Sequence, residues 1–487
     1  MRRTLVIILL SVWKERTAHY TCDAFHAYSP TKLALSQGNI STDCPSFGDA
    51  TKPYPANFYK KLSLWDGLMN RSGETLYGSE IGLEAIWRNQ NPPDCLKAKY
   101  IISGGWSFGF GSRLHFETVG LAIAMQLGRV YLPHPDGDSL HWETKNPFCE
   151  TLQMNNGLGC YYEQWSSCNM THVLHGARPG YDVNSLPNLD TLTFQNIFDS
   201  EAQRQEMIKK YDGIPSFNMA LHDHKGQKER AYIPFEVRHI LFNCSPVLDH
   251  ARHYWWRAVA LTYLLRPNKE TSALLANYST LSIPDFEQCI AMYVRHGDKS
   301  VEMKLVDLQT YLNSATALWR RGLKPVSYST ISAPSITGRE GEGYNNLSNS
   351  NSNSNGTIFL GTEDPAVLSE ATEWGRSNGW NIAFTNLFDR AEVSAKESWA
   401  GKRGKAEVHH PLEYLSMILN LQYALKSQAW VCTLASNFCR VIDELRATVG
   451  AKANHLFVDL SSETCARPPC VGDGIWDFQF RYRRLEK

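Results

Sequence analysis

Short apolar runs that end at polar residues recur in the second half of the chain. The clearest is Cys289 to Val294, which is β-prone, about one strand long and followed directly by Arg295-His296-Gly297-Asp298-Lys299. Similar runs predict strands at Thr357 to Gly361 and at Ala429 to Thr433, each leading through a polar turn into a helical pattern. Strands that alternate with helices in this way predict an α/β domain.

Two residues in these turns are placed to begin the following helices. Thr362 precedes one helical stretch, and Ser436 precedes the helix expected from Phe438 to Arg446. Serine and threonine are favoured at helix N-caps, and the free amides of a helix N-terminus bind phosphate. Both turns are therefore candidate phosphate sites.

The first half of the chain predicts a second α/β unit. Tyr100 to Ser103 predicts a strand that enters a Gly-rich turn, Leu114 to Leu127 a helix, and Arg129 to Leu132 the next strand. This Rossmann-like start lacks the full Gly-x-Gly-x-x-Gly dinucleotide pattern. Trp255 to Arg266 predicts an apolar helix that leads from this lobe into the other.

Arg295 is the first candidate for ligand binding. Ligands of α/β folds bind beyond the carboxyl ends of the strands, where this residue is expected. The planar fork of arginine makes paired, charge-assisted hydrogen bonds that suit a diphosphate. Charges at a strand end also often reach only solvent, so this segment alone leaves both interpretations open.

Five segments, taken in order, resemble motifs of the α-1,6-fucosyltransferases. The resemblance extends from about Cys95 to Asp459. The matching segments are Gly109 to His115, Trp255-Trp256 with Tyr263 to Pro267, Val294 to Lys299, Leu360 to Pro365 and Val431 to Arg440. Any one of these motifs is weak evidence, whereas their common order is strong evidence.

This resemblance implies a GT-B-like α/β glycosyltransferase with two Rossmann-like lobes, of which the C-terminal lobe binds the nucleotide. It implies inverting transfer of L-fucose from GDP-β-L-fucose, in α-1,6 linkage, to GlcNAc of N-glycan cores, without a metal or other cofactor. Arg295 would bind the β-phosphate, assisted by Ser436 and by the turn from Gly109 to Gly111. The alternatives are a fucosyltransferase that acts on chitin-type oligosaccharides or on protein, and a non-catalytic sugar- or nucleotide-binding relative.

A carboxylate must also deprotonate the acceptor hydroxyl. The position that corresponds to the family's glutamate is Met303, and Glu302 lies one residue earlier. The spacing from Glu302 to Tyr311 equals the family's Glu-to-Tyr spacing, so a one-residue deletion after Lys299 explains the shift. Glu302 is therefore the expected base, with Lys299 orienting it and Asp298 as the next candidate. An exposed loop glutamate is the alternative.

The residues expected to contact the nucleotide depart from the family pattern. Tyr293 stands where the family has a histidine that contacts guanine, and Asn420 stands where an aspartate reads the guanine edge. Asparagine can accept from a guanine N–H but lacks the charge that strengthens such a bond. Asp364 and Tyr311 complete the expected nucleotide site.

Composition excludes some classes of function. The chain has 49 basic and 49 acidic residues, which argues against a nucleic-acid binder. Its twelve cysteines include no Cys-x-x-Cys pair, which favours disulfides over zinc. The family resemblance implies the pairs Cys432–Cys439 and Cys95–Cys168, and proximity suggests Cys149–Cys160 and Cys465–Cys470. Asp136-Gly137-Asp138 fits the Asp-x-Asp pattern of metal-dependent glycosyltransferases, but a turn is favoured there because the segment follows His134-Pro135.

The expected organisation begins with residues 1–13 as a signal peptide or short signal-anchor, because Arg2-Arg3 precedes an apolar stretch too short to cross a bilayer. With the family resemblance, this predicts the secretory pathway and the Golgi lumen, with membrane contact if the segment is uncleaved. The other expected regions are a stem and helical region (14–94), an N-terminal α/β lobe (95–275), a nucleotide-sugar-binding lobe (276–460), a disordered Ser- and Asn-rich insertion within it (327–356) and a tail (461–487).

Overall fold

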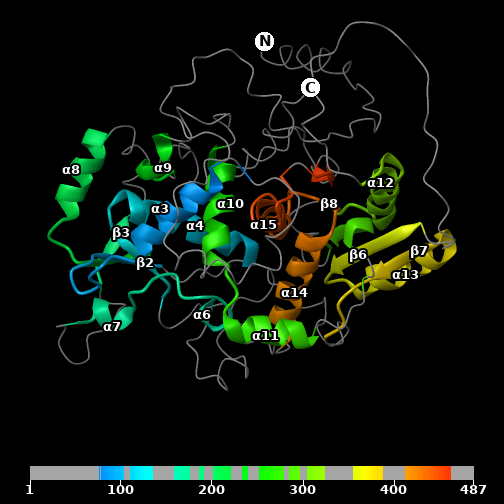
Figure 1. The fold of residues 1–487 in the computed structure, drawn as a ribbon, viewed down its shortest axis with the longest axis horizontal. Coiled ribbons are helices and arrows are strands. Elements are labelled where there is room, and N and C mark those ends of the chain that lie inside the picture. Colours follow the sequence, from blue (N-terminus) through cyan, green and yellow to red (C-terminus); the bar gives the residue numbers. More distant parts are fainter. Residues whose placement is uncertain are drawn as a thin grey trace, which may run out of the picture.

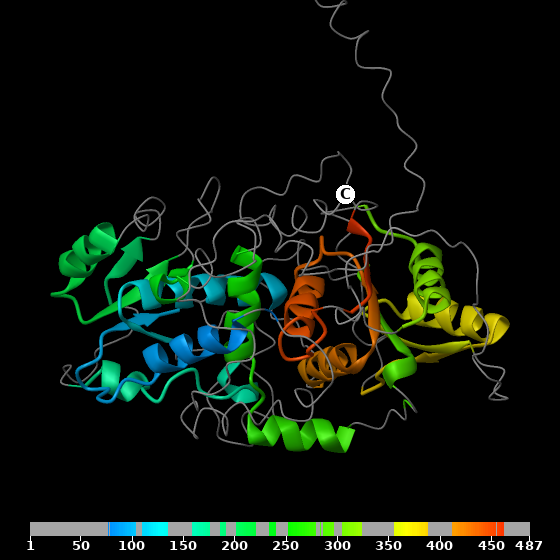
Figure 2. The same cartoon turned by 45° about the horizontal axis from the view of Figure 1, so that its top comes forward.

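The structure is a computed structural model of the whole chain. It describes residues 76, 78–103, 110–134, 158–175, 186–190, 201–220, 233–239, 252–278, 283, 286–296, 304–323, 355–387, 412–453 and 455–461. These residues form two α/β lobes that lie side by side, with helix α10 between them (Figures 1 and 2). No helix among the described residues is long and apolar enough to cross a membrane.

The N-terminal lobe is built on a parallel sheet of four short strands in the order β2-β1-β4-β3. Its strands are β1 (Tyr100–Ile102), β2 (Val130–Leu132), β3 (Asn188–Asp190) and β4 (Ser216–Ala220). The helices that accompany this lobe are α3 (Ser79–Gln90), α4 (Phe110–Gln126), α6 (Leu158–Tyr161), α7 (Met170–Val173), α8 (Glu201–Tyr211), α9 (Phe235–His239), α10 (Arg252–Leu264) and α11 (Lys269–Tyr278).

The C-terminal lobe is built on a parallel five-stranded sheet in the order β7-β6-β5-β8-β9. Its strands are β5 (Cys289–Val294), β6 (Gly356–Thr362), β7 (Trp380–Ala383), β8 (Ala429–Cys432) and β9 (Phe457–Asp459). Its helices are the 3-10 turn η8 (Phe286–Gln288), α12 (Leu308–Arg321), α13 (Pro365–Asn378), α14 (Glu413–Lys426) and α15 (Asn437–Arg446). The strand order reverses direction between β5 and β8, and the ligands of such sheets bind at this switch point.

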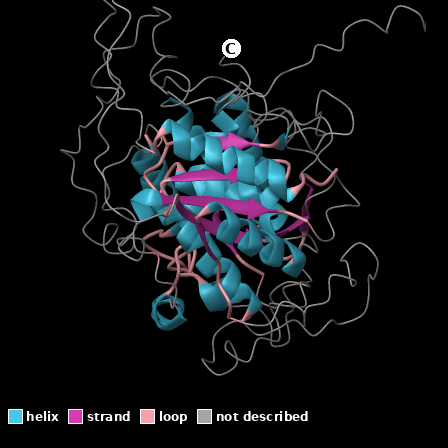
Figure 3. Ribbon diagram, turned by 90° about the vertical axis from the view of Figure 1, so that its right-hand side faces the viewer, coloured by secondary structure: helices cyan, strands magenta, loops and turns pink. Residues whose placement is uncertain are grey.

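Helices cover both faces of the C-terminal sheet, as Figure 3 shows. Alternate residues of β5 explain this arrangement, because side chains of a strand point to opposite faces. Cys289 and Ala291 belong to the core that includes α14 and α15, whereas Ile290, Met292 and Val294 belong to the core under α12. A strand buried on both faces reads as a continuous apolar run, which is the pattern that revealed it.

The expected fold class is confirmed: the protein has two Rossmann-like α/β lobes with parallel sheets, in a GT-B-like arrangement. The bounds of β5 agree with the prediction, and each of the other expected strands differs from it by one residue at one or both ends. Helix α4 begins at Phe110, one turn before the expected Leu114. β6 begins at Gly356, inside the range assigned to the insertion, and the rest of that range except Asn355 lies outside the described residues.

Thr362 does not cap the helix that follows β6, so this prediction was wrong. The N-cap is Asp364, whose carboxylate accepts a hydrogen bond from the Ala366 amide at 2.9 Å. Pro365 explains the shift, because proline favours the first helical position and holds the residue before it in an extended conformation. The Thr362 hydroxyl instead accepts from the Asp364 amide at 3.2 Å.

A buried carboxylate joins the two lobes. Glu444 on α15 accepts a hydrogen bond from Arg257 Nε on α10 at 2.8 Å, and its other oxygen lies 2.9 Å from His115 Nε2 on α4. All three side chains are almost completely buried. Burial alone would raise the pKa of Glu444, but Arg257 and His115 outweigh it and hold the pKa below its usual range. Breaking such a pair costs about 3–5 kcal/mol, because it leaves a charge buried without a partner.

Two of the expected disulfides are confirmed. Cys95 is bonded to Cys168 in the N-terminal lobe, and Cys432 is bonded to Cys439 between the end of β8 and the first turn of α15. The second bond ties strand to helix across the turn that contains Ser436. Cys160 is also disulfide-bonded. The expected partner Cys149, the pair Cys465–Cys470 and the segment 1–13 lie outside the described residues.

Acid should destabilise the protein through its buried histidines. Burial lowers the pKa of His115 to about 4 and that of His455 to about 3, whereas the pKa of a histidine in an unfolded chain is about 6.5. Between these values the unfolded chain binds more protons than the folded one, so the free energy of unfolding falls as the pH falls below about 6.5. Urea unfolding between pH 7.5 and 4.5 should show this decrease. His455→Gln should reduce the change in unfolding free energy per pH unit, and the exposed control His175→Gln should not. Equal pH dependence in both variants would contradict the assignment of this effect to buried His455.

Candidate functional site at the strand ends of the C-terminal lobe

The site is centred on the switch point of the C-terminal sheet. Arg295 directly follows β5, and the turn from Thr433 to Ser436 follows β8 and leads into α15. The partial positive charge of the α15 N-terminus is therefore delivered to the same edge of the sheet as the Arg295 guanidinium. Ser436 occupies the expected N-cap position, but its side chain makes no capping hydrogen bond.

The turn after β8 is held by the end of β9. Asp459 Oδ1 accepts hydrogen bonds from the Leu434 amide and from the Ser461 amide, both at 2.9 Å. The Ser461 hydroxyl in turn accepts from the Ala435 amide at 3.0 Å. The turn is thus fixed before any ligand arrives. The hydroxyl of Thr433 is buried in it and, among the residues that the structure describes, has no hydrogen-bond partner.

Arg440 supports the same turn from inside the helix. Its Nε donates to the Leu434 carbonyl at 2.6 Å, and its Nη1 donates to Asn437 Oδ1 at 2.9 Å. Burial, and to a smaller extent nearby Arg257, lowers the pKa of Arg440 to about 9, while Glu444 and Asp459 oppose the shift. A guanidinium buried behind the turn adds positive potential at the N-terminus of α15.

Arg295 is held by residues of two neighbouring elements. Its guanidinium forms an ion pair with Glu363 after β6, and Nη1 also donates to the His296 carbonyl at 3.2 Å. Burial raises the pKa of Tyr311 on α12, whose hydroxyl accepts a hydrogen bond from the Arg295 amide. Tyr311 is only 1% exposed, so in this structure it lies behind Arg295. Its expected contact with a nucleotide stays a prediction.

A second pair lies beside the first. His296 Nδ1 is 3.4 Å from Asp364 Oδ2, and its Nε2 is 2.8 Å from the Val306 carbonyl, which accepts the hydrogen bond. Asp364, predicted to contact the nucleotide, is thus engaged in capping α13 and in contact with His296. The strand ends of β5 and β6 are therefore tied together by two cross-strand pairs.

The N-terminal lobe brings a second helix N-terminus to this region. Gly111, in the first turn of α4, lies against the backbone of Asn437 and Phe438, and a Cβ built on it would be 2.6 Å from both backbones. The Ser112 hydroxyl accepts a hydrogen bond from the Asn437 side-chain amide. Only glycine permits this approach, so the N-termini of α4 and α15 meet at the lobe interface.

Tyr293, Gly361 and Asn420 line a small pocket beneath the strand ends. The Tyr293 ring packs over Gly361 and makes an edge contact with Phe438, with 5.0 Å between ring centroids. Asn420 Oδ1 accepts a hydrogen bond from the Thr385 hydroxyl at 2.7 Å. The two residues that depart from the family pattern therefore line the same pocket, and their expected contact with a base stays a prediction.

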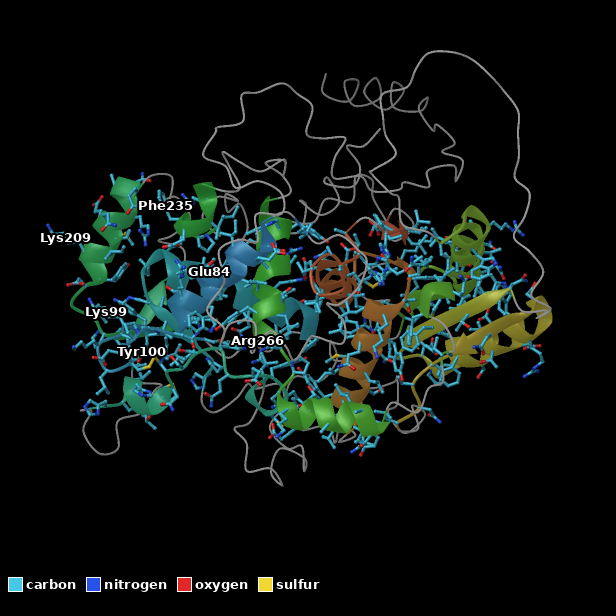
Figure 4. The ribbon with its side chains drawn as sticks, in the orientation of Figure 1. Glu84, Lys99, Tyr100, Lys209, Phe235 and Arg266 are labelled. Carbon is cyan, nitrogen blue, oxygen red and sulfur yellow. A yellow bond between two sulfur atoms is a disulfide. The ribbon has the colours of Figure 1, made fainter. Side chains whose placement is uncertain are left out.

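Not every predicted residue can be placed. Glu302, Lys299, Asp298 and Gly109 lie outside the described residues, as do Asp136 to Asp138. Among the described residues no group of three or more metal-ligating side chains is present. Arg266, from another matched motif, lies just beyond the end of α10 (Figure 4). It is buried, and its guanidinium stacks on the Tyr263 ring, 3.9 Å from the ring centroid.

Sequence reasoning missed three groups of this site: Glu363, Thr433 and Asp459. Glu363 could have been found, because in parallel strands that end in register the residues that follow are neighbours. Asp459 gave no such signal, since its contact with the turn depends on the position of β9 at the edge of the sheet.

No family model matches the chain, and no curated protein matches it. Solved structures of fucosyltransferases resemble it at low identity. A mutant of Arabidopsis thaliana FUT1 in complex with GDP is 13% identical, with 81% of this chain and 79% of that chain covered and a TM-score of 0.38. POFUT1 in complex with GDP-fucose is 10% identical (74% and 97% covered, TM-score 0.40), and the α-1,6-fucosyltransferase NodZ soaked with GDP-fucose is 12% identical (72% and 93% covered, TM-score 0.33).

Gly111→Ala should separate the two helix N-termini, because the new methyl group would overlap the backbone at Asn437. We expect a loss of about 1–3 kcal/mol in the free energy of unfolding, the usual cost of overpacking. Gly213→Ala is the matched control, since no atom lies within 4 Å of its Cβ position. Equal unfolding midpoints for both variants would show that the contact is not tight.

Proposed function

We propose that the protein is an inverting fucosyltransferase that transfers L-fucose from GDP-β-L-fucose to GlcNAc of an N-glycan core in α-1,6 linkage. The observation that carries the proposal is the position of Arg295 at the switch point of a parallel sheet, beside the N-terminus of α15. The ordered motifs of the sequence support the same assignment. We also propose that the protein acts in the Golgi lumen, with its N-terminal segment as anchor or signal.

The chemistry requires stabilisation of the departing diphosphate. Arg295 supplies a forked cation, and the α15 N-terminus supplies amides and a partial positive charge. Buried Arg440 adds positive potential behind that helix end. Fixed donors of this kind stabilise developing negative charge without reorganising during the reaction. No step in this scheme requires a metal ion.

The acceptor hydroxyl must lose its proton as it attacks the anomeric carbon. We assign Glu302 as the general base, with Lys299 orienting it, because the segment that carries them directly follows Arg295 and His296 in the sequence. Asp298 is the alternative base in this segment.

A second candidate function is a non-catalytic relative that binds a sugar or nucleotide. The observation that favours it is the pair Tyr293 and Asn420, because the Asn420 amide lacks the charge of a carboxylate and its oxygen already accepts a hydrogen bond from Thr385, which weakens any contact with a guanine edge. If the protein is a fucosyltransferase, chitin-type oligosaccharides or protein are the alternative acceptors.

These functions are separated by incubating the purified lumenal protein with GDP-fucose and a GlcNAc-terminated biantennary glycan and measuring the products by mass. Neither transfer nor donor hydrolysis would favour the binding protein.

Arg295→Ala should abolish transfer and weaken GDP binding by about 2–3 kcal/mol, the scale of a charge-assisted hydrogen bond. Arg295→Lys should restore little, because lysine cannot make the forked contact. Calorimetry with GDP checks both variants, and Arg376→Ala on the exposed face of α13 is the control. Unchanged GDP affinity in Arg295→Ala would place the diphosphate elsewhere.

Glu302→Gln should lower turnover by about 10²–10⁴-fold, the usual contribution of a general base, while GDP affinity is retained. The substitution is nearly isosteric, so the fold should survive. Glu370→Gln on α13, which is exposed, is the matched control. Full activity of Glu302→Gln would move the base to another carboxylate, with Asp298→Asn the next variant to measure.

A further inference from the structure

We propose that Glu363 is the positioning residue of the diphosphate site: its carboxylate fixes the Arg295 side chain at the switch point. The inference rests on the proposed function, since it concerns the residue assigned to the diphosphate. It gives a role to a residue of the matched segment Leu360 to Pro365 for which the sequence suggested none, namely a carboxylate whose partner is the binding arginine and not the ligand.

The sheet register brings the two side chains together. β5 and β6 are parallel, with Val294 opposite Thr362 as the last pair. The next residues along the two strands are Arg295 and Glu363, which form the ion pair. The pairing is therefore set by the backbone and does not depend on a flexible loop.

The backbone of Arg295 is already fixed from other directions. Tyr311 accepts the hydrogen bond of its amide, and the neighbouring His296 is bound to Val306 and lies close to Asp364. Rotational freedom of the long Arg295 side chain would be costly to lose on binding a ligand. The ion pair with Glu363, together with the bond to the His296 carbonyl, restricts that freedom in advance. A guanidinium has five N–H donors, so one carboxylate does not exhaust it.

The pair is a poor device for stability, which argues for a functional role. The two side chains are 19% and 34% exposed, and partly exposed ion pairs contribute little to folding. In addition, Glu363 Oε2 is buried and, among the described residues, has no hydrogen-bond partner. An unsatisfied buried oxygen opposes folding, so the carboxylate is retained at a cost in stability. Polar groups that lower the stability of the fold in this way are expected at functional sites.

The alternative role for Glu363 is competition with the phosphates for Arg295, and the other charged groups around this position bear on it. Asp364 on the α13 side and Asp459 at the end of β9 are also anionic, so a diphosphate enters a region with several carboxylates. If Glu363 only competed with the phosphates for Arg295, its removal would strengthen diphosphate binding. If it positions Arg295, its removal weakens that binding. The two roles predict opposite signs.

The test is a double-mutant cycle on ligand binding with the full chain. Calorimetry would measure GDP and guanosine, which lacks the diphosphate, for the parent, Arg295→Ala, Glu363→Gln and the double variant. We expect Glu363→Gln to weaken GDP about tenfold, the equivalent of one net hydrogen bond, and to leave guanosine affinity unchanged. The double variant should bind GDP no more weakly than Arg295→Ala alone, because Glu363 acts only through that arginine.

Several outcomes would overturn the inference. Tighter or equal GDP binding in Glu363→Gln would show competition or no role, and additive losses would show that Glu363 acts independently of Arg295. A loss of guanosine affinity would show general damage, which Glu363→Asp and the control Glu370→Gln would check by their unfolding midpoints and GDP affinities. Unchanged GDP binding in Arg295→Ala would instead refute the proposed diphosphate site itself, whatever Glu363 does.

Discussion

The arrangement of the two lobes depends on one buried carboxylate. Glu444 lies on α15, yet its partners Arg257 and His115 lie on α10 and α4 of the other lobe. Because the charges of Glu444 and Arg257 are both shielded from water, moving the helices slightly apart would leave a buried charge without its partner. The same contact fixes the rotation of α15 about its axis. It therefore fixes where the first turn of that helix points, which is towards α4 and the strand ends.

In the candidate site too, polar groups of one element are held in place by polar groups of another. Its polar groups are held mainly by other polar groups of the protein: Asp459 holds the turn after β8, Arg440 supports it from within, and Tyr311 holds the Arg295 amide. A site assembled in this way loses little entropy when a charged ligand binds. The strand register provides the framework, since β5, β6 and β8 end close to one another.

Sequence patterns predicted the parts that depend on local periodicity. β5 was located to the residue because its six apolar residues end abruptly at Arg295, and the N-cap position of Ser436 followed from the turn after β8. The start of α4 and the cap of α13 were misplaced, because a Gly-rich approach and Pro365 moved them by a few residues. The Glu444 network could not be predicted: its partners are 187 and 329 residues away in sequence, and no short-range pattern encodes such a contact.

The role of β9 has a consequence for synthesis of the protein. Asp459 at its end fixes the turn between β8 and α15, although β9 is the last strand in chain order among the residues that the structure describes. A nascent chain that has emerged only as far as α15 contains Arg295, Glu363 and Ser436, but not the carboxylate that organises the turn. The geometry of the proposed diphosphate site can therefore form only after residue 461 has left the ribosome. Binding of the proposed donor would then be confined to chains in which β9 has paired with β8.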